Sequence, residues 1–549
     1  MMRKPVFPAV VCVVFVLAIC ALPAVAQKNV QSISNAIVSY PVHSDISAPL
    51  SSYPAQAIVG SSRVHAPLKP KEHLLRSVGE AAGHGLGSTG NAGPSVGLNF
   101  EGISGDPGSA ASVNCPIVSG VQLAPPDTNA AVGDTQVVQW VNICYSVFDK
   151  ATGALIAGPF AGNHFWSGFG GVCQADNDGD PIIQFDKANH VWVASQNVFG
   201  PFATCLAVST TADATGSYNR YQFTQPGFPD YHKWGLTPHA YYQTQNNFGS
   251  GAAYVGVTVC AYQADAIRAG SKKAKQICMV DNSNGTLFDD SFLPADADAD
   301  PPTAGPAPEV FVGSIDNVNP GSNVYQYVLN VSFKGKGKAT LSGTNGTMPI
   351  AVPSYSLACG GFGACVPQPS AGSELLDSLG DRLMYRLALF DDGTTQHFLV
   401  THSVNDTAAT GARWYEFTAP TGSTTLSLAQ SSQTPDDSEY RWMGSIARDN
   451  SGNIALGYSR SSATAGDFPS IYVSGQTAGE PAGTTDAEVL VKQGGGSQIS
   501  TANRWGDYSS MALDGADHCT FWYTTEYYPF DGSFQWYTNL NTVKFASCP

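Results

Sequence analysis

Basic residues recur at similar places in several segments of the chain. Lys233, Arg441 and Arg504 each precede a tryptophan, and Arg382 begins a comparable segment. Guanidinium groups bind carboxylate, sulfate or phosphate through paired hydrogen bonds, so a cluster of them would form an anion-binding surface. The tryptophans could stack on a sugar or on the guanidinium groups, or fill the space between packed sheets.

Acidic residues begin other segments of the same kind. Asp127 and Asp180 occupy this position, and Glu309 begins a looser match. If the segments are equivalent, these acids and the four basic residues bind a ligand together. The alternative is a charge-balanced ring, in which each arginine pairs with an acid nearby in sequence and only joins neighbouring units.

The last segment contains residue types that can carry out hydrolysis. Asp507, Tyr508 and Glu526 could supply a general acid and base, or a tyrosine nucleophile activated by a glutamate. The aromatic residues around Glu526 are equally typical of a packed outer strand. These three residues are therefore candidates for the catalytic groups of a glycoside hydrolase.

Three carboxylates stand close together in an oxygen-rich turn. Asp176, Asp178 and Asp180 surround Gly179, and such turns bind Ca²⁺. The turn does not have the spacing of an EF-hand loop, and the alternative is an Asx-turn that leads into a strand. Apart from this calcium ion, we expect no cofactor.

Several function classes are excluded by composition and motifs. The net charge is −16 and there is no long basic cluster, which argues against nucleic acid as a partner. The chain contains no H-E-x-x-H string, serine-hydrolase elbow, P-loop or dinucleotide fingerprint. Metalloprotease, serine hydrolase, kinase and NAD chemistry are therefore disfavoured.

The N-terminal region divides into two parts. Arg3 and Lys4 precede an apolar stretch, and Ala24-Val25-Ala26 is a cleavage site, so residues 1–26 predict a signal peptide. Lipidation at Cys20 is a weaker alternative. Residues 27–99 are rich in Ser, Ala, Gly and Pro and predict a flexible, low-complexity arm or linker. A pro-segment, or an arm lying on the main domain, is the alternative. We expect a secreted protein, extracellular or periplasmic, with no membrane span.

Ten cysteines remain after the predicted signal peptide. An even number in an oxidising compartment predicts disulfides, and no C-x2-C pair indicates zinc. Sequence alone leaves the connectivity open. Pairing of neighbours, each bond joining strands of one sheet, predicts the bonds Cys115–Cys144, Cys173–Cys205, Cys260–Cys278, Cys359–Cys365 and Cys519–Cys548.

Residues 100–549 are predicted to form one all-β domain. Only 13% of residues are charged, while glycine, proline and aromatic residues are abundant. The recurrent segments begin at intervals of 53 to 76 residues, which favours a β-propeller, most simply of seven blades, with six as the alternative. Two packed β domains are the competing architecture. The clearest strand-like runs are 137–149, 181–196, 252–262, 397–404, 453–461 and 519–528.

Several strings resemble those of a known group of proteins. They are PPDTN (125–129), NDGDPII (177–183), LDSLGDRLMYR (376–386), YRWMGSIA (440–447) and RWGDYSSM (504–511). They resemble secreted bacterial propeller proteins of the sialidase superfamily, with BNR-like repeats, over residues 115–549. The resemblance implies a propeller fold and export. The Asp-box of true sialidases is matched only in part, at 186–192 and 449–452.

These observations lead to three functional hypotheses. The first is a propeller that binds an extracellular glycan or a surface protein at the mouth of its channel, through Lys233, Arg382, Arg441, Arg504, Asp127 and Asp180. The second is a sialidase-like glycoside hydrolase that uses channel-mouth acids with an arginine clamp. The third is a structural or adhesive protein tethered by its arm. We expect a monomer in each case.

Overall fold

The computed structural model describes residues 30–55, 63–64, 93–108, 113–117, 123–249, 254–282, 289–298, 308–314, 320–361, 363–370, 374–499 and 503–548. The predicted signal peptide lies outside these residues. Nearly all regular structure in the described part is β-strand. The helices there are single turns: η1 (Leu50–Ser52), η2 (Gly162–Trp166), α1 (Gly171–Ala175), α2 (Ala264–Arg268) and η4 (Ala358–Gly360). No described helix is long and apolar enough to cross a bilayer.

The strands form seven successive four-stranded antiparallel meanders. Their first strands are β8 (Asn129–Val132), β12 (Ile182–Asp186), β16 (Phe228–Leu236), β20 (Asp290–Ala297), β27 (Met384–Asp391), β31 (Tyr440–Arg448) and β35 (Ser510–Leu513). Their second strands are β9 (Gln136–Val141), β13 (Val191–Val198), β17 (Ala240–Phe248), β21 (Glu309–Ser314), β28 (Thr395–Asn405), β32 (Ile454–Ser461) and β36 (Phe521–Tyr527).

The outer strands complete each meander. The third strands are β10 (Cys144–Asp149), β14 (Ala203–Ser209), β18 (Tyr254–Gln263), β22 (Gly321–Ser332), β29 (Thr410–Pro420), β33 (Ser470–Gln476) and β37 (Tyr537–Lys544). The fourth strands are β11 (Leu155–Ala161), β15 (Tyr218–Thr224), β19 (Gln276–Asp281), β23 (Lys338–Ser342), β30 (Ser427–Gln433), β34 (Val489–Lys492) and β5 (Ser95–Ser104). The remaining short strands are β4 (Arg63–Val64), β6 (Val113–Asn114), β7 (Leu123–Ala124), β24 (Pro349–Tyr355), β25 (Ala364–Val366) and β26 (Leu376–Asp377).

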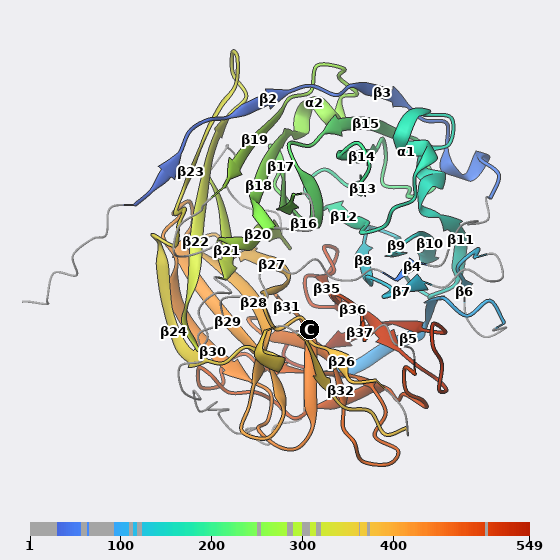
Figure 1. Cartoon of the computed structure of the whole chain (residues 1–549), viewed down its shortest axis with the longest axis vertical. Coiled ribbons are helices and arrows are strands. Elements are labelled where there is room, and N and C mark those ends of the chain that lie inside the picture. Colours follow the sequence, from blue (N-terminus) through green and yellow to red (C-terminus); the bar gives the residue numbers. More distant parts are fainter. Residues whose placement is uncertain are drawn as a thin grey trace, which may run out of the picture.

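The first strands form a closed ring. Each contacts the first strand of the next sheet, and β35 contacts β8 to close the circle. Between β20 and β27 this contact is a parallel pairing, with Ala295 opposite Leu387. Figure 1 shows the sheets arranged radially around this centre. The chain is a β-propeller. The predicted all-β propeller is confirmed, while the blade number stays a prediction that the ring of seven first strands supports.

The two ends of the domain meet in one sheet. Strand β5 pairs antiparallel with β37, so Phe100 lies opposite Leu540 and Ser95 opposite Lys544. The fourth strand of the last sheet therefore comes from the region before the first sheet. This pairing holds the ring closed, because separating the ends would break a whole strand pairing. The domain begins at the β5 strand, a few residues earlier than the predicted boundary at residue 100.

Residues 30–46 pair with the propeller along its outer strands, which corresponds to the alternative of an arm lying on the main domain. Strands β1 (Ser32–Ile33), β2 (Ile37–Ser39) and β3 (His43–Ile46) pair antiparallel with β23, β19 and β15, the fourth strands of three consecutive sheets. In Figure 1 this blue segment runs along the outer edge of the propeller. Because a sheet edge presents unpaired backbone groups, a short polar segment can still be ordered there by main-chain hydrogen bonds.

Strands of the propeller are buried on both faces. All eight residues of β13 and all seven of β36 are buried, since each sheet packs between two others. Trp234, Trp442 and Trp505 are among the buried residues of the central core cluster, so they fill the space between sheets. Gly235 lies against the next sheet, where a Cβ atom would come within 2.3 Å of the Ala295 carbonyl oxygen. Small residues near the axis therefore permit the close approach of first strands.

The five expected disulfides are all present. Cys115–Cys144, Cys173–Cys205, Cys260–Cys278, Cys359–Cys365 and Cys519–Cys548 are bonded. Of these, Cys260 and Cys278 lie directly opposite each other on β18 and β19. Each bond closes a loop of 32 residues or fewer. Several disulfides are typical of proteins from an oxidising compartment.

Candidate functional site

The beginnings of the first strands share an unusual backbone conformation. Each first strand carries, within it or just before it, a non-glycine residue with φ between 45° and 59°: Asp127, Asp180, Tyr231, Ser291, Arg386, Met443 and Asp507. Left-handed backbone is costly for residues with a side chain, and it is concentrated at functional sites. In β16, β20, β27 and β31 the strand register also shifts near this residue.

The strand register shows that the segments aligned in the sequence do not occupy equivalent positions in their sheets. Glu309 begins β21, the second strand of its sheet, whereas the first strand of that sheet begins at Asp290. Arg382 and Arg504 lie before their first strands, but Arg441 lies within β31. The sequence alignment missed this because the register shifts add residues to the strands without changing their apolar character.

Five of the seven predicted anchor residues nevertheless meet at one end of the ring. Lys233 interacts electrostatically with Asp127, Asp180 and Arg382, and also with Asp230, which sequence analysis missed. Arg504 interacts with Asp127, Arg382 and Asp230. We call Asp127, Asp180, Asp230, Lys233, Arg382 and Arg504 the mouth cluster.

Lys233 is the buried centre of the cluster. Its side chain is 1% exposed, and its Nζ atom donates to the His232 carbonyl oxygen at 3.1 Å. Nζ also lies 3.5 Å from the ring centre of Tyr231, 4.4 Å from that of Tyr508 and 5.7 Å from that of Tyr385. Burial lowers the pKa of Lys233 to about 7, although the neighbouring Asp180 opposes this shift. We call Tyr231, Tyr385 and Tyr508 the tyrosine cage.

The arginines of the cluster are bound by adjacent acids. Arg382 donates from Nε and Nη2 to both carboxylate oxygens of Asp381, at 3.1 and 2.8 Å. Arg504 donates from Nε to Asp507 at 2.9 Å and also contacts its second oxygen. Arg382 lies 4.5 Å from the Tyr231 ring centre as well. Both arginines therefore pair with an acid nearby in sequence, as in the predicted charge-balanced ring.

The acids Asp127, Asp180 and Asp230 differ from those partners. No described Lys, Arg or His side chain forms a salt bridge with any of them. Asp127 is buried and hydrogen-bonds with Asp180, and Asn142 donates to it at 3.0 Å. Burial, and then the like charge of Asp180, raise the pKa of Asp127 well above its usual range. The same two causes raise the pKa of Asp230 to about 7.

A neutral histidine supports the cluster from beneath. His232 is buried, and burial lowers its pKa to about 3. Its ring nitrogens face the Asn197 amide at 2.8 Å and the Ser195 hydroxyl at 3.4 Å. These polar residues belong to β13, in the preceding sheet. They fix the orientation of the strand that carries Asp230, Tyr231 and Lys233.

Below the mouth, a second ion-pair group closes the channel. Arg386 bonds Asp296 at 3.0 Å and Asp298 at 2.7 Å, and Lys187 bonds Asp298 at 2.8 Å. The void between these side chains has a volume of about 30 Å³, room for about one water molecule. The mouth cluster therefore lies over a nearly filled channel.

The predicted catalytic residues occupy different depths. Asp507 is half-buried beside Arg504, and the Tyr508 ring is stacked on Tyr385 at 5.1 Å. Glu526 is 1% exposed and accepts the Gly506 N–H at 2.6 Å, so it supports the loop that carries Asp507. Burial raises the pKa of Glu526 well above its usual range.

Arg441 belongs to a separate ion-pair group. It donates to Glu488 at 2.6 Å and to Asp437 at 2.8 Å. Glu488 also accepts from Tyr458 at 2.7 Å and Arg460 at 3.2 Å. The prediction that Arg441 faces the same mouth as Arg382 and Arg504 finds no supporting contact among the described residues.

The predicted calcium turn is not formed as a metal site. Among the described residues, no three His, Cys, Asp or Glu side chains converge closely enough to hold a metal ion. Asp178 accepts the Phe199 N–H at 3.0 Å, while Asp180 turns toward Asp127. The carboxylates of Asp178 and Asp180 therefore serve separate contacts, because the chain enters a first strand at this point.

Several residues of the site were missed by sequence reasoning. They are Asp230, Tyr231 and Tyr385, and each stands within three residues of a predicted anchor. Their signal was the repeated association of an acid, a tyrosine and a base near the start of a segment.

Comparisons with known proteins identify no family and only weak structural similarities. No protein-family model matches the chain, and no curated protein matches it. Solved structures that it resembles include the Dos1 propeller (10% identity, 75% of this chain and 76% of that chain covered, TM-score 0.34) and Drosophila Semaphorin 1b, extracellular domains 1–2 (8%, 83% and 88%, 0.34). A third is the catalytic domain of the Coprinopsis cinerea GH62 α-L-arabinofuranosidase (10%, 57% and 90%, 0.25). Similarities this weak carry no functional argument.

Proposed function

We propose that the mouth cluster binds a neutral glycan. The observation that carries this proposal is the division of its acids into two sets. Asp381 and Asp507 are bound to arginines, whereas Asp127, Asp180 and Asp230 have no basic partner at salt-bridge distance among the described residues. Carboxyl groups of this second set can accept hydrogen bonds from sugar hydroxyls.

The charge balance disfavours an acidic ligand. An anion would have to displace Asp381 from Arg382 or Asp507 from Arg504, leaving a charge without its partner in a poorly hydrated place. It would also approach three further carboxyl groups. The arginine clamp of the sialidase-like hypothesis is therefore occupied by the protein's own side chains.

Lys233 and the tyrosine cage form the support beneath this surface. Asp180 and Asp230 are only half-buried, whereas Lys233 and the three rings are buried. The ammonium group stabilises the ionised forms of the acids, and the rings stabilise the ammonium. The ligand would therefore contact Asp180 and Asp230 first.

A glycoside hydrolase is the second candidate. The specific observation in its favour is Asp230, whose pKa of about 7 keeps a carboxylic acid protonated near neutrality, as a general acid requires. Asp180 would then act as the second carboxylate, with Asp507 and Tyr508 nearby in the last sheet. Glu526 would position the Gly506 loop and not touch the sugar.

The cellular setting belongs to the same proposal. Five disulfides support secretion, and the strings at 125–129, 177–183, 376–386, 440–447 and 504–511 support relationship to sialidase-superfamily propellers. We propose a secreted, monomeric protein that meets glycans outside the cytoplasm.

A glycan array tests the binding proposal. The array would present neutral oligosaccharides beside sialylated and uronate-containing ones, and titration calorimetry would measure affinity for the strongest neutral ligand. We expect Asp180→Asn to weaken binding at least tenfold, because the amide keeps the shape but loses the charged acceptor. Asp517→Asn, in an exposed turn between β35 and β36, is the matched control and should bind like the wild type.

Two outcomes would reject the binding proposal. One is an array that responds only to acidic glycans, and the other is unchanged affinity in Asp180→Asn. Hydrolysis is tested separately on a panel of aryl glycosides. Turnover that falls at least 100-fold in Asp230→Asn would support the hydrolase, while retained binding without turnover would leave the binding protein.

A further inference from the structure

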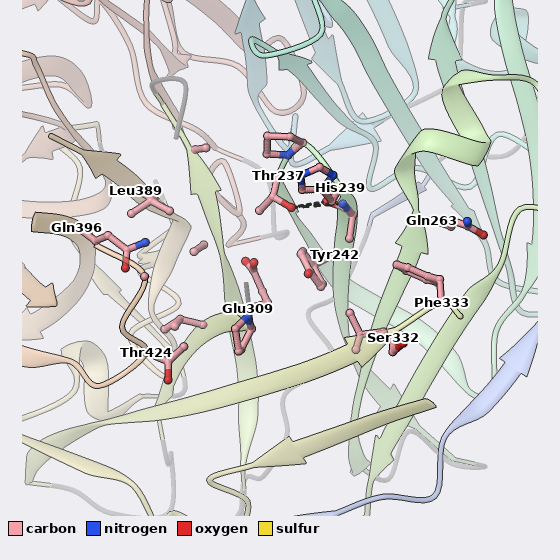
Figure 2. A pocket seen from close by; sticks show the side chains of 18 of the residues that line it. Thr237, His239, Tyr242, Gln263, Glu309, Ser332, Phe333, Leu389, Gln396 and Thr424 are labelled. Carbon is pink, nitrogen blue, oxygen red and sulfur yellow. Dashed lines mark hydrogen bonds between the residues drawn. The ribbon is translucent and has the colours of Figure 1, made fainter. Parts of the chain in front are cut away.

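A second cavity lies at the opposite end of the first strands from the mouth cluster. Its walls come from three consecutive sheets, at the β16–β17 turn, the end of β20, the start of β21 and the turn after β22, with β27, β28 and the β29–β30 turn opposite. Its volume is about 490 Å³, within the usual range for small-molecule sites. Figure 2 shows the lining side chains directed toward a common space.

A carboxyl group stands inside this cavity without a cationic partner. Glu309 is 4% exposed, and the Ala295 backbone N–H donates to its carboxyl group. Among the described residues, its Oε1 atom has no hydrogen-bond partner and no basic side chain forms a salt bridge with it. Buried polar atoms are almost always hydrogen-bonded, and leaving one without a donor costs on the order of 1–3 kcal/mol.

A second unsatisfied acceptor lines the same cavity. The Oε1 atom of Gln396, on β28, is buried and has no hydrogen-bond partner in the part of the chain that the structure describes. In Figure 2, Glu309 and Gln396 come from different sheets on the same side of the space. Tyr242 lines the same cavity and interacts electrostatically with Glu309, but among the described residues its hydroxyl does not hydrogen-bond to the Glu309 Oε1 atom. The missing partner is therefore a hydrogen-bond donor.

The other walls are apolar. Leu389 and Phe398 are buried on one side, and Val331 and Phe333 lie on the other. The charged groups at the rim are Asp265, Lys334 and His239. Asp265 is bound to Arg268, and Lys334 is exposed at the surface. A ligand here needs an apolar body and a donor group at one end.

We propose that this cavity binds a small amphiphilic amine, with its ammonium group on Glu309 and its apolar body between Leu389, Phe398 and Phe333. An ammonium group offers three donors, enough for both unsatisfied acceptors. Its charge compensates the carboxylate, which in the empty cavity is disfavoured by burial and by Asp296. This site is independent of the proposed glycan site.

The test compares amines with alcohols of the same shape. A panel of phenylalkylamines and n-alkylamines, each with its matched alcohol, is screened by thermal shift, followed by titration calorimetry of the best amine. We expect at least one amine to bind at least tenfold more tightly than its alcohol. Glu309→Gln should remove that tenfold preference, and Glu374→Gln, a glutamate away from the cavity, should keep it.

The melting temperature distinguishes a variant that has lost only the binding site from one that has lost its fold. Replacing a buried carboxylate by an amide removes a desolvation cost, so Glu309→Gln should melt at the same temperature as the wild type or higher. Thr424→Trp, at the cavity rim, should weaken amines and alcohols alike by obstructing the space. The proposal is overturned if no amine binds, if alcohols bind as tightly, or if a folded Glu309→Gln retains the preference.

Discussion

The Nζ atom of Lys233 lies 3.5 Å from the ring centre of Tyr231, two residues earlier on the same strand. Side chains two residues apart on a regular strand share a face but lie further apart. Here Tyr231 adopts φ 49° and the register shifts between Asp230 and Lys233. The irregular backbone of β16 thus brings the ammonium group over the ring, and the other cage tyrosines complete its environment from different sheets.

Replacing the buried lysine should change how stability depends on pH. The folded-state pKa of Lys233 is about 7, below its ordinary value of 10.5. Between these two pKa values the unfolded chain binds more protons than the folded protein. The unfolding free energy of the wild type therefore rises with pH in this range, and this gain is lost as pH falls through 7. We expect Lys233→Met to lack this dependence, which amounts to at most about 1.4 kcal/mol per pH unit.

Urea unfolding of both proteins at pH 7, 8 and 9 measures the difference. The control is Lys336→Met at an exposed position, which should stay within about 0.5 kcal/mol of the wild type at each pH. A constant difference between wild type and Lys233→Met across this range would contradict the burial of an ionisable amine at this site.

The raised pKa of Asp230 predicts the opposite dependence of stability on pH, at lower pH. The pKa of Asp230 is about 7 in the folded protein and 3.8 ordinarily, so the folded state binds more protons between these values. The contribution of Asp230 to the unfolding free energy is complete below pH 4 and is lost as pH rises through 7. Relative to wild type, Asp230→Asn should therefore gain about 2 kcal/mol between pH 4 and pH 8, after allowance for partial hydration.

Thermal or urea unfolding at pH 4, 6 and 8 tests this gain. Asp517→Asn serves as the control because Asp517 is exposed and its pKa is lowered, chiefly by its hydrogen bonds with Thr520. Equal pH profiles for wild type and Asp230→Asn would show that Asp230 is not held protonated in the folded protein.

A buried arginine attaches the N-terminal arm. Arg220, which is 1% exposed, donates from Nε and Nη2 to the two oxygens of Asp45 on β3, at 2.9 and 2.7 Å. Among the described residues, Asp45→Ala leaves this guanidinium with the Phe165 and Ser167 carbonyl oxygens as hydrogen-bond partners and the Phe169 ring beside it. We expect a loss of about 2 kcal/mol in unfolding free energy and faster proteolytic cleavage of residues 30–55.

Limited proteolysis followed by mass spectrometry locates the cleavage. The matched control is Asp265→Ala, which removes a more exposed carboxylate from Arg268 and should cost under about 1 kcal/mol. An arm that stays protected in Asp45→Ala would show that the pairing of β1, β2 and β3 holds it without this ion pair.

The close approach of first strands predicts a severe effect at one glycine. In Gly235→Ala the new methyl group would come within 2.3 Å of the Ala295 carbonyl oxygen, which belongs to the backbone of the next sheet. The strands must separate, so we expect a loss of about 2 kcal/mol or more in urea unfolding. Gly200→Ala is the control, since no atom lies within 4 Å of its added Cβ. Equal stabilities would mean that the ring accommodates the methyl group.

Local sequence was sufficient for most propeller strands. The run at 137–149 corresponds to β9 and β10. The run at 397–404 lies within β28, and the run at 519–528 spans β36. These strands are buried on both faces, so their continuous apolar and aromatic character marks them without knowledge of their neighbours. The five disulfides were predictable for a related reason, because both cysteines of each pair are near in sequence.

The partners of the arm were beyond local reasoning. Ser32 lies opposite Ser342, more than three hundred residues later, and the short polar strands β1 to β3 have no apolar pattern of their own. Their order comes from main-chain bonding to edges that exist only after the sheets have formed. Glu488, the partner of Arg441, lies 47 residues later in the sequence, and no motif near Arg441 indicates it.

The amino-acid sequence by itself determined a β-propeller whose repeated segments begin with acidic or basic residues. This was possible because buried strands and turns can be recognised from the residues of short stretches of the chain. Only the tertiary structure decided which of those starts meet. The register shifts in the first strands set the side chains of Asp230, Tyr231 and Lys233 toward the axis, while they leave Arg441 in another ion pair and Glu309 at the opposite end of the ring. Charge interactions depend on distances of a few ångströms, and those distances come from how the sheets pack around a common axis.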